Sequence, residues 1–244
     1  MPKRKPEGKF EFVKTILIAG ALALGFRSLL FEPFNIPSGS MIPTLLVGDY
    51  LFVSKYSYGY SRYSFPFGVA PIDGRIFESQ PERGDVAVFR QPKNESVAYI
   101  KRIVGLPGDR IQVTDGVLRI NDVPVNRSKK SIATAIDGYN VIRFVLYEET
   151  LPNGRSYVIQ ERSDNDMLDN TSVYEVPPGH YFMMGDNRDN SRDSRAASVG
   201  MVPAKNLIGR AERLFFSHNG SASLWQIWKW PFAIRYGRLG DGVI

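Results

Sequence analysis

The sequence predicts a mostly β fold that follows one N-terminal apolar helix. After residue 50 the chain is dominated by short apolar or alternating runs, such as DVAVFR, VAYIKRIVGL and RSYVIQER, which are typical of strands. Asp115-Gly116 and Asn153-Gly154 are strong two-residue hairpin signals. Because little helical periodicity accompanies them, we expect a β-rich core of the Greek-key or meander barrel type.

The first element is an apolar stretch, residues 13–31, which can span a membrane if Lys14 and Arg27 extend to its surfaces. The net charge is +6, and much of it is clustered at the N-terminus, in Lys3, Arg4, Lys5 and Lys9. This placement favours an anionic membrane over nucleic acid and predicts a cytoplasmic N-terminus. The alternative is a cleavable signal peptide ending near Ala21-Leu22-Ala23. Both interpretations place residues 32–244 outside the cytoplasm.

The composition excludes several kinds of functional site. The chain has 244 residues, 43% hydrophobic and 23% charged, as in an ordinary globular protein of one or two domains. It has no cysteine and only two histidines, which excludes disulfides and thiolate sites and argues against a histidine zinc cluster. No glycine-rich phosphate loop is present. We expect no metal and no cofactor.

Three further segments have a distinctive composition. Residues 58–77 are aromatic with several turn formers, so we expect an extended loop or a hairpin arm. Residues 126–140 and 161–172 are polar, and we expect loops there. The C-terminal stretch 224–238, LWQIWKWPFAIRYGR, combines tryptophans with cations. It predicts either contact with the headgroup region of a membrane or closure of the β core from below.

The first candidate catalytic residues lie in a serine-containing turn and in an apolar strand that contains a lysine. The turn is Ser38-Gly39-Ser40-Met41, directly after the apolar stretch. In YIKRIV, strand alternation points Lys101 and Arg102 to opposite faces, so one of them faces inward or lines a cleft. Burial makes a lysine amine lose its proton more readily, and a neutral lysine can activate a serine. The alternatives are that both cations extend to solvent, or that His180 completes a Ser-His-Asp triad.

Residues 185–195, GDNRDNSRDSR, form a very polar stretch after the apolar YFMM. It could be a solvated loop, a metal site through Asp186, Asp189 and Asp193, or an ion-pair network that supports a site. It lacks the glycine and terminal glutamate of a calcium loop, and three arginines interleave with the aspartates. We therefore favour the ion-pair network.

Together these stretches closely resemble bacterial type I signal peptidases, the membrane-bound serine endopeptidases that remove signal peptides. The resemblance rests on PSGSMIPTL, RGDVAVF, YIKRIVGLPGD and GDNRDNSRDSR, which occur in the family's order behind an N-terminal anchor. It implies that Ser40 is the nucleophile and Lys101 the general base. It also implies that Ser38 contributes to the oxyanion hole and that Ser191 orients the lysine amine. Asp193 and Arg195 would form a supporting ion pair.

The resemblance further implies the substrate and its pockets. Exported preproteins would be cut after small residues at −1 and −3, the Ala-x-Ala pattern, through an acyl-enzyme. Seven residues would line those pockets: Phe34, Ile36, Met41, Leu45, Val88, Tyr99 and Ile100. The rival class is a membrane-anchored β domain that only binds. A self-cleaving repressor relative is a second rival, but it does not explain the anchor.

The domain layout and location also follow from the resemblance. Residues 1–31 would be a cytoplasmic tail and membrane anchor. The β-rich catalytic core would be discontinuous, 32–110 and 178–244, with a β subdomain inserted at 111–177. The protein would lie in the cytoplasmic (inner) membrane as a single-pass protein, with its catalytic domain on the outer, periplasmic side. Its partners would be signal peptides and membrane lipid, with no nucleic acid.

Overall fold

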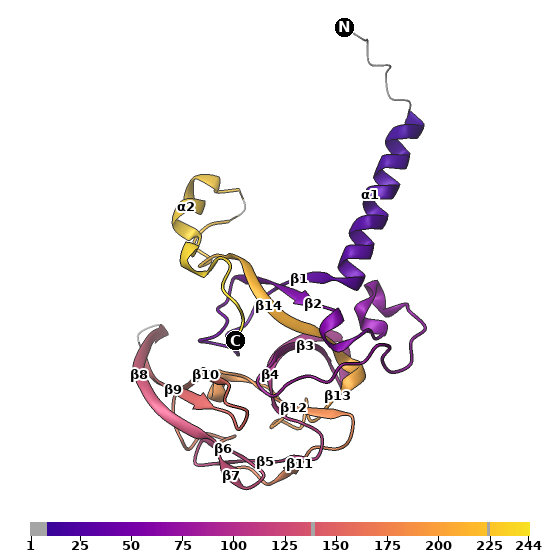
Figure 1. The fold of residues 1–244 in the computed structure, drawn as a ribbon. Coiled ribbons are helices and arrows are strands. Elements are labelled where there is room, and N and C mark those ends of the chain that lie inside the picture. Colours follow the sequence, from indigo (N-terminus) through magenta and orange to yellow (C-terminus); the bar gives the residue numbers. More distant parts are fainter. Residues whose placement is uncertain (1–8, 138–139, 224) are drawn as a thin grey trace.

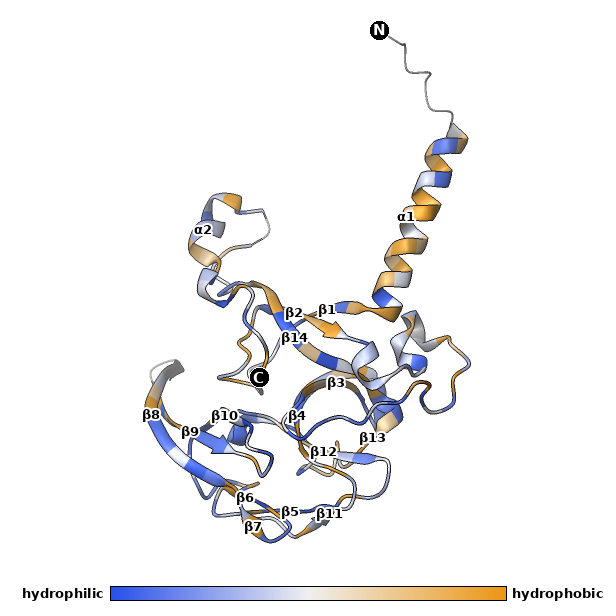
Figure 2. Ribbon diagram, viewed as in Figure 1, coloured by the Kyte–Doolittle hydropathy of each residue, from blue (hydrophilic) through white to orange (hydrophobic). Residues whose placement is uncertain are grey.

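The computed structural model describes residues 9–137, 140–223 and 225–244 and shows a β body from which one long helix projects (Figure 1). Helix α1, Lys9–Leu29, is apolar along most of its length and lies apart from the sheets (Figure 2). Its part Phe10–Leu29 is long and apolar enough to cross a membrane, judged by length and composition alone. Lys3, Arg4 and Lys5, which predicted the orientation of this helix, lie outside the described residues.

The main sheet has seven strands in the order β1-β2-β14-β3-β4-β12-β13. Their bounds are β1 Phe31–Asn35, β2 Asp49–Ser54, β3 Val86–Gln91, β4 Asn94–Gly105, β12 His180–Met184, β13 Val202–Pro203 and β14 Leu207–Ser217. Neighbouring strands are antiparallel throughout. Among the described strands, β1 and β13 are edges, so the expected barrel is wrong. The two-residue β13 is too short to close the sheet onto β1.

Two smaller antiparallel sheets are built from residues 110–175. One has the order β11-β5-β6-β7 and contains β5 Arg110–Thr114, β6 Val117–Ile120, β7 Val123–Pro124 and β11 Tyr174–Glu175. The other has the order β10-β9-β8 and contains β8 Asn126–Asp137, β9 Asn140–Thr150 and β10 Ser156–Glu161. Asp115-Gly116 forms the predicted two-residue turn between β5 and β6. Asn153-Gly154 also lies in a hairpin connection, between β9 and β10, but this loop is longer than two residues because Thr150 pairs with Ser156. Asp115 and Gly116 both have positive φ, 48° and 72°, as this tight turn requires.

Strand β8 contradicts the expected loop at 126–140. Its polar residues Arg127 to Ser131 suggested a loop, but they belong to one strand of a long ribbon that pairs with β9 along its length. Because both faces of this ribbon reach solvent, pairing of the backbone forms the strand without an apolar face. By contrast, the loop expected at 161–172 is confirmed except at Glu161, which ends β10, and residues 162–173 contain turns and bends with no strand.

The remaining elements are short. They are η1 Tyr56–Tyr58, η2 Arg62–Ser64, η3 Pro66–Gly68, η4 Arg188–Asn190, η5 Ala204–Asn206, η6 Ile227–Lys229, α2 Trp230–Ala233 and η7 Tyr236–Arg238. Residues 58–77 form an extended loop, as expected, closed by an isolated bridge between Tyr60 and Ile76.

The small sheets share a core with the main sheet. Val104 of β4 and Phe182 and Met184 of β12 pack in one buried cluster with Ile111 and Ile159 of the smaller sheets. We propose that 111–177 is an inserted subdomain whose hydrophobic core packs against one face of the main sheet.

The C-terminal tryptophans do not close the core. Trp225 and Trp228 are 87% and 67% exposed, and α2 projects on the same side of the β body as α1 (Figure 1). The nearby cations Arg235 and Arg238 point inward instead and pair with the buried Asp49. They hold the base of this segment to the body and leave its aromatic tip in solvent.

A buried ion pair fastens the inserted sheets to the turn that carries η4. Arg188 Nη1 donates a 2.8 Å hydrogen bond to Glu149 Oε1, and the guanidinium also binds the other carboxylate oxygen. Tyr157 donates its hydroxyl to the same carboxylate at 2.9 Å. Glu149 and Arg188 are 0% and 1% exposed. If either side chain were removed, water could not reach the remaining charge to solvate it.

Substituting Glu149→Ala is therefore expected to lower the free energy of unfolding by about 3 kcal/mol, because Arg188 would remain buried and unpaired. The neighbouring Glu148 is the matched control. Its pair with Lys130 is exposed, so Glu148→Ala should change stability by less than about 0.5 kcal/mol. Denaturant unfolding of both variants in detergent measures the difference, and equal effects would contradict the assigned role of Glu149.

Candidate active site

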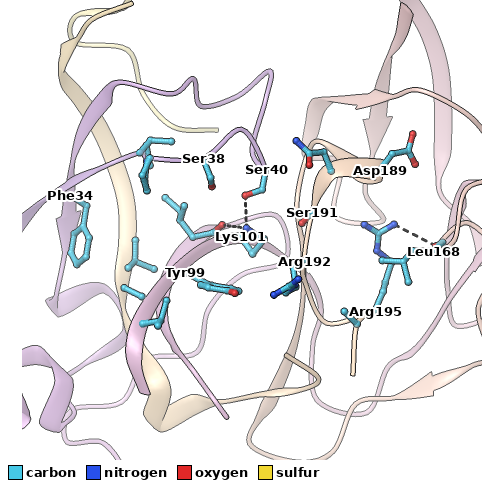
Figure 3. A pocket seen from close by; sticks show the side chains of 18 of the residues that line it. Phe34, Ser38, Ser40, Tyr99, Lys101, Leu168, Asp189, Ser191, Arg192 and Arg195 are labelled. Carbon is cyan, nitrogen blue, oxygen red and sulfur yellow. Dashed lines mark hydrogen bonds between the residues drawn. The ribbon is translucent and has the colours of Figure 1, made fainter. Parts of the chain in front are cut away.

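Ser40 and Lys101 meet between two elements of the main sheet (Figure 3). Lys101 lies in β4, and Ser40 lies in the turn between β1 and β2. Lys101 Nζ is 2.6 Å from Ser40 Oγ and donates a 2.9 Å hydrogen bond to the carbonyl of Ile100. The two side chains are nearly enclosed, with 9% of Ser40 and 4% of Lys101 exposed. The structure therefore brings together the two residues that the sequence singled out as nucleophile and base.

The serine turn is held from behind by apolar packing and from the side by backbone bonds. Met41 and Leu45, spaced one helical turn apart, are fully buried in the cluster that also contains Leu51. The carbonyl of Ser40 accepts a 3.1 Å hydrogen bond from the Asn187 amide, and the Asn187 side chain donates to Gly39 at 2.9 Å. Ser40 is thus positioned in the structure without substrate.

Burial perturbs the lysine. Desolvation lowers the pKa of Lys101 to about 8, although the carboxylates of Asp193 and Asp186 act in the opposite direction. The described residues offer Lys101 no carboxylate within ion-pair distance. A substantial fraction of this amine is therefore neutral at mildly alkaline pH, which is the form that accepts a proton.

Arg102 occupies the opposite face of β4 and is also buried. Its guanidinium makes two hydrogen bonds to Asp186, of 2.8 and 2.7 Å, and lies 3.9 Å from the centre of the Tyr157 ring. The alternative in which Lys101 and Arg102 both extend to solvent is therefore wrong. Alternation in β4 separates the two cations as predicted, and each has its own buried environment.

The stretch 185–195 folds around buried ion pairs. Asp193 and Arg195 form the predicted pair at 2.9 Å, and Asp193 also accepts a 3.0 Å hydrogen bond from the Gly185 amide. Burial acts to raise the pKa of Asp193, but Arg195 and these hydrogen bonds outweigh it and lower the pKa. Asp189 accepts from two backbone amides. In the part of the chain that is described, no group of three or more histidine, aspartate or glutamate side chains is arranged to hold a metal ion.

Ser38 and Ser191 both line the cavity beside the pair. Ser191 Oγ is buried and has no hydrogen-bond partner among the described residues, so the expected bond to the lysine amine is not formed here. Sequence reasoning did not single out Gly185. A Cβ atom there would lie 2.2 Å from Ser191 Oγ and 2.5 Å from the carbonyl of Ser40, so only glycine lets these segments approach.

A cavity of about 900 Å³ runs past Ser40 and Lys101. Five of the seven predicted pocket residues line it: Phe34, Ile36, Val88, Tyr99 and Ile100. Met41 and Leu45 do not line the cavity, so the prediction that they contact the substrate directly is wrong. Both side chains are buried in the core behind the serine. The lining also includes residues that the sequence did not predict to line a pocket: Asn35, Pro37, Val97, Ala98, Met167, Leu168, Asp189, Asn190, Arg192, Ala196 and Ala197.

Two strand edges border this cavity. β1 pairs only with β2, and β4 pairs with β12 only from Arg102 onward, so among the described strands the edge of β4 before Arg102 is open on that side. An extended peptide can therefore add backbone hydrogen bonds to either edge.

Comparison with known proteins identifies the family of this chain. Residues 9–216 match the family described as "Signal peptidase, peptidase S26". The chain belongs to this signal peptidase family. Signal peptidase I of Rickettsia typhi is 47% identical over 204 residues, which cover 80% of this chain and 76% of that protein. Signal peptidase I of Rickettsia conorii is 46% identical over 218 residues, which cover 86% and 78%.

A crystal structure of a signal peptidase I from Enterococcus faecalis V583 is 25% identical and covers 54% of this chain and 97% of that one. Its TM-score of 0.32 is too low for the two folds to be compared. Family membership confirms that this signal peptidase is an enzyme, a serine peptidase that removes signal peptides. Together with helix α1, it indicates a membrane-anchored protein.

Proposed function

We propose that this signal peptidase cuts preproteins with a serine–lysine pair in which Ser40 attacks and Lys101 is the general base. The observation that supports it is the 2.6 Å contact between Lys101 Nζ and Ser40 Oγ in a nearly enclosed site. A protonated lysine cannot act as a base, but burial lowers the pKa of Lys101 to about 8. His180 lies elsewhere, with Nδ1 2.9 Å from the Pro178 carbonyl.

The reaction follows from this arrangement. Lys101 takes the Ser40 proton as Oγ attacks the scissile carbonyl, then gives that proton to the leaving amine. The Ser40 amide, which has no acceptor among the described residues, and the Ser38 hydroxyl would hold the oxyanion. Each donor would contribute about 3 kcal/mol to the transition state. Water, activated by Lys101, then hydrolyses the acyl-enzyme.

Supporting roles are assigned on the same basis. The Asp193–Arg195 pair fixes the segment beside the lysine, and its neighbour Gly185 allows that segment to reach the serine turn. Ser191 orients the amine once rotation about its Cα–Cβ bond brings the hydroxyl to Nζ. No metal or cofactor takes part in this scheme.

Specificity is assigned to the apolar half of the cavity. Phe34, Ile36, Val88 and Ile100 would surround the small side chains at −1 and −3, while the backbone of the signal peptide pairs with the edges of β1 and β4. Met41 and Leu45 would act indirectly, because they fill the space behind this half and fix its depth. Bulky residues at −1 or −3 would find no room.

The location follows from α1 and the exposed tryptophans. We assign α1 to a single crossing of the cytoplasmic membrane, with the N-terminus inside and the β body on the outer side. Trp225, Trp228 and Phe232 would enter the headgroup region of the same membrane surface. Lipid and signal peptide are therefore the expected partners, and no nucleic acid is.

Substituting Ser40→Ala or Lys101→Ala is expected to reduce cleavage of an Ala-x-Ala preprotein at least about a thousandfold, with the fold retained. Lys101→Arg should be equally inactive, because a guanidinium stays protonated. His180→Ala is the control and should cleave at the wild-type rate. Substantial turnover by Lys101→Ala, or a loss of activity in His180→Ala, would overturn the mechanism. Absence of cleavage by the wild type would favour a binding domain.

The pH dependence gives an independent test. Only neutral Lys101 accepts the serine proton, so kcat/KM should rise with pH and level off above an apparent pKa of about 8. Because the Asp193 carboxylate acts to raise the pKa of Lys101, Asp193→Asn should move this rise to lower pH. A profile that is flat from pH 6 to 10 would exclude lysine as the titrating base.

Lipid contact can be measured on the full chain because all three of its tryptophans, Trp225, Trp228 and Trp230, lie in the C-terminal segment. In anionic vesicles, lipids brominated near the headgroup should quench this fluorescence, and aqueous iodide should quench it poorly. Efficient quenching by iodide with no effect of the brominated lipid would show that the segment stays in water. In that case the membrane contact is limited to α1.

A further inference from the structure

The cavity continues past the catalytic pair into a second half with a different character. In Figure 3, Phe34 lies on one side of Ser40 and Lys101, and Leu168, Asp189 and Arg192 lie beyond them. The first half is formed by β1, β3 and β4 and is apolar. The second half is formed by 167–168 and 189–197, where an exposed Met167 side chain lies among polar groups. We call it the distal half.

The two halves have different relations to a substrate. Under the proposed function, which this inference extends, the small residues before the scissile bond occupy the apolar half. The peptide bond to be cut must lie at Ser40 Oγ, and an extended chain advances about 3.3 Å per residue. The residues after the scissile bond therefore enter the distal half, where they belong to the mature protein.

Arg192 is the exposed cation of the distal half. Its side chain is exposed, and it makes no hydrogen bond or ion pair with any described residue. Among its charged neighbours, Asp193 pairs with Arg195. Asp189 has no ion-pair partner among the described residues: its Oδ2 accepts from the backbone amides of Arg162 and Ser163, and its Oδ1 is buried without a hydrogen-bond partner. Arg192 is more exposed than Asp189, so its charge is the one that a substrate side chain reaches first.

We propose that the distal half is a binding site for the first residues of the mature chain, and that Arg192 makes it select for a carboxylate there. Met167 and Leu168 supply apolar contact for the aliphatic part of such a residue, and the guanidinium binds its carboxylate. The preferred preprotein carries an aspartate or glutamate shortly after the cut, and a lysine at the same place is disfavoured by repulsion.

The test uses the full chain in a non-ionic detergent with peptides that share one Ala-x-Ala signal sequence. The peptides carry Asp, Asn or Lys at +1, +2 or +3. Wild type should cleave the best Asp peptide with a kcat/KM about two- to fivefold above its Asn counterpart, the size of an exposed ion pair. The Lys peptide should fall below the Asn peptide by a similar factor.

The variants locate the source of this preference. Arg192→Ala should remove it while leaving cleavage of the Asn peptides unchanged, and Arg192→Glu should reverse it in favour of Lys. Lys130→Ala, which removes an exposed cation of β8 that does not line the cavity, is the control for net charge and should keep the wild-type preference.

The outcomes separate this inference from the proposed function. If wild type cleaves the Asp and Lys peptides equally, or if Arg192→Ala keeps the preference, the distal site is wrong while the mechanism stands. If Lys130→Ala loses the preference, net charge is its cause and the site is wrong. If Arg192→Ala slows all peptides alike, its role is structural. If wild type cleaves none of them, the proposed function itself fails.

Discussion

Asp186 is the residue on which the site depends, because its carboxylate and its backbone carbonyl together join three segments distant in sequence. It receives two hydrogen bonds from Arg102 of β4 and one of 2.5 Å from Thr44, four residues beyond the nucleophile. Its backbone carbonyl accepts from Gln160 of β10. The strand that carries the lysine, the turn that carries the serine and the inserted sheets therefore share one anchor point. A displacement of the lysine strand or the serine turn breaks a buried charge-assisted bond, and a displacement of the inserted sheets breaks the backbone bond from Gln160.

The contrast between Arg102 and Lys101 shows how the same interior serves two purposes. A buried charge is costly unless it is paired, and Arg102 is paired so completely that it remains ionised and structural. Lys101, one residue away on the other face, has a serine hydroxyl and a carbonyl in place of a carboxylate. Because no carboxylate contacts Lys101, burial favours the neutral form of its amine. The neutral amine is the form that can accept the serine proton. A carboxylate moved into contact with Lys101 would keep the amine protonated and unreactive.

The sequence predicted the features that depend on short segments of the chain. Alternation in β4, the Asp115-Gly116 turn and the mostly β fold were predictable, because strand period and positive φ are properties of short segments. The strand β8 was not, because its polar residues are ordered by pairing with β9 rather than by a buried face. Met41 was assigned to the wall of the pocket by the family resemblance, but a resemblance in sequence does not fix the direction of a side chain. Met167 carried no signal, and Arg192 was seen only as one arginine of a supporting polar stretch, since only the tertiary fold brings their segments to the serine.

The path of the chain from membrane to nucleophile explains why the serine lies so close to the helix. α1 ends at Leu29, whose carbonyl accepts the Tyr60 hydroxyl, and the backbone continues directly into β1. At this junction Glu32 pairs with Lys55, a side chain only 1% exposed, so the first residues after the helix are bound to the β body. β1 then borders the apolar half of the cavity and leads within five residues of its end, Asn35, to Ser40. One short, packed segment thus fixes the height of the scissile bond relative to the helix. A longer or looser connection would leave the same catalytic pair intact and its distance from the membrane undetermined.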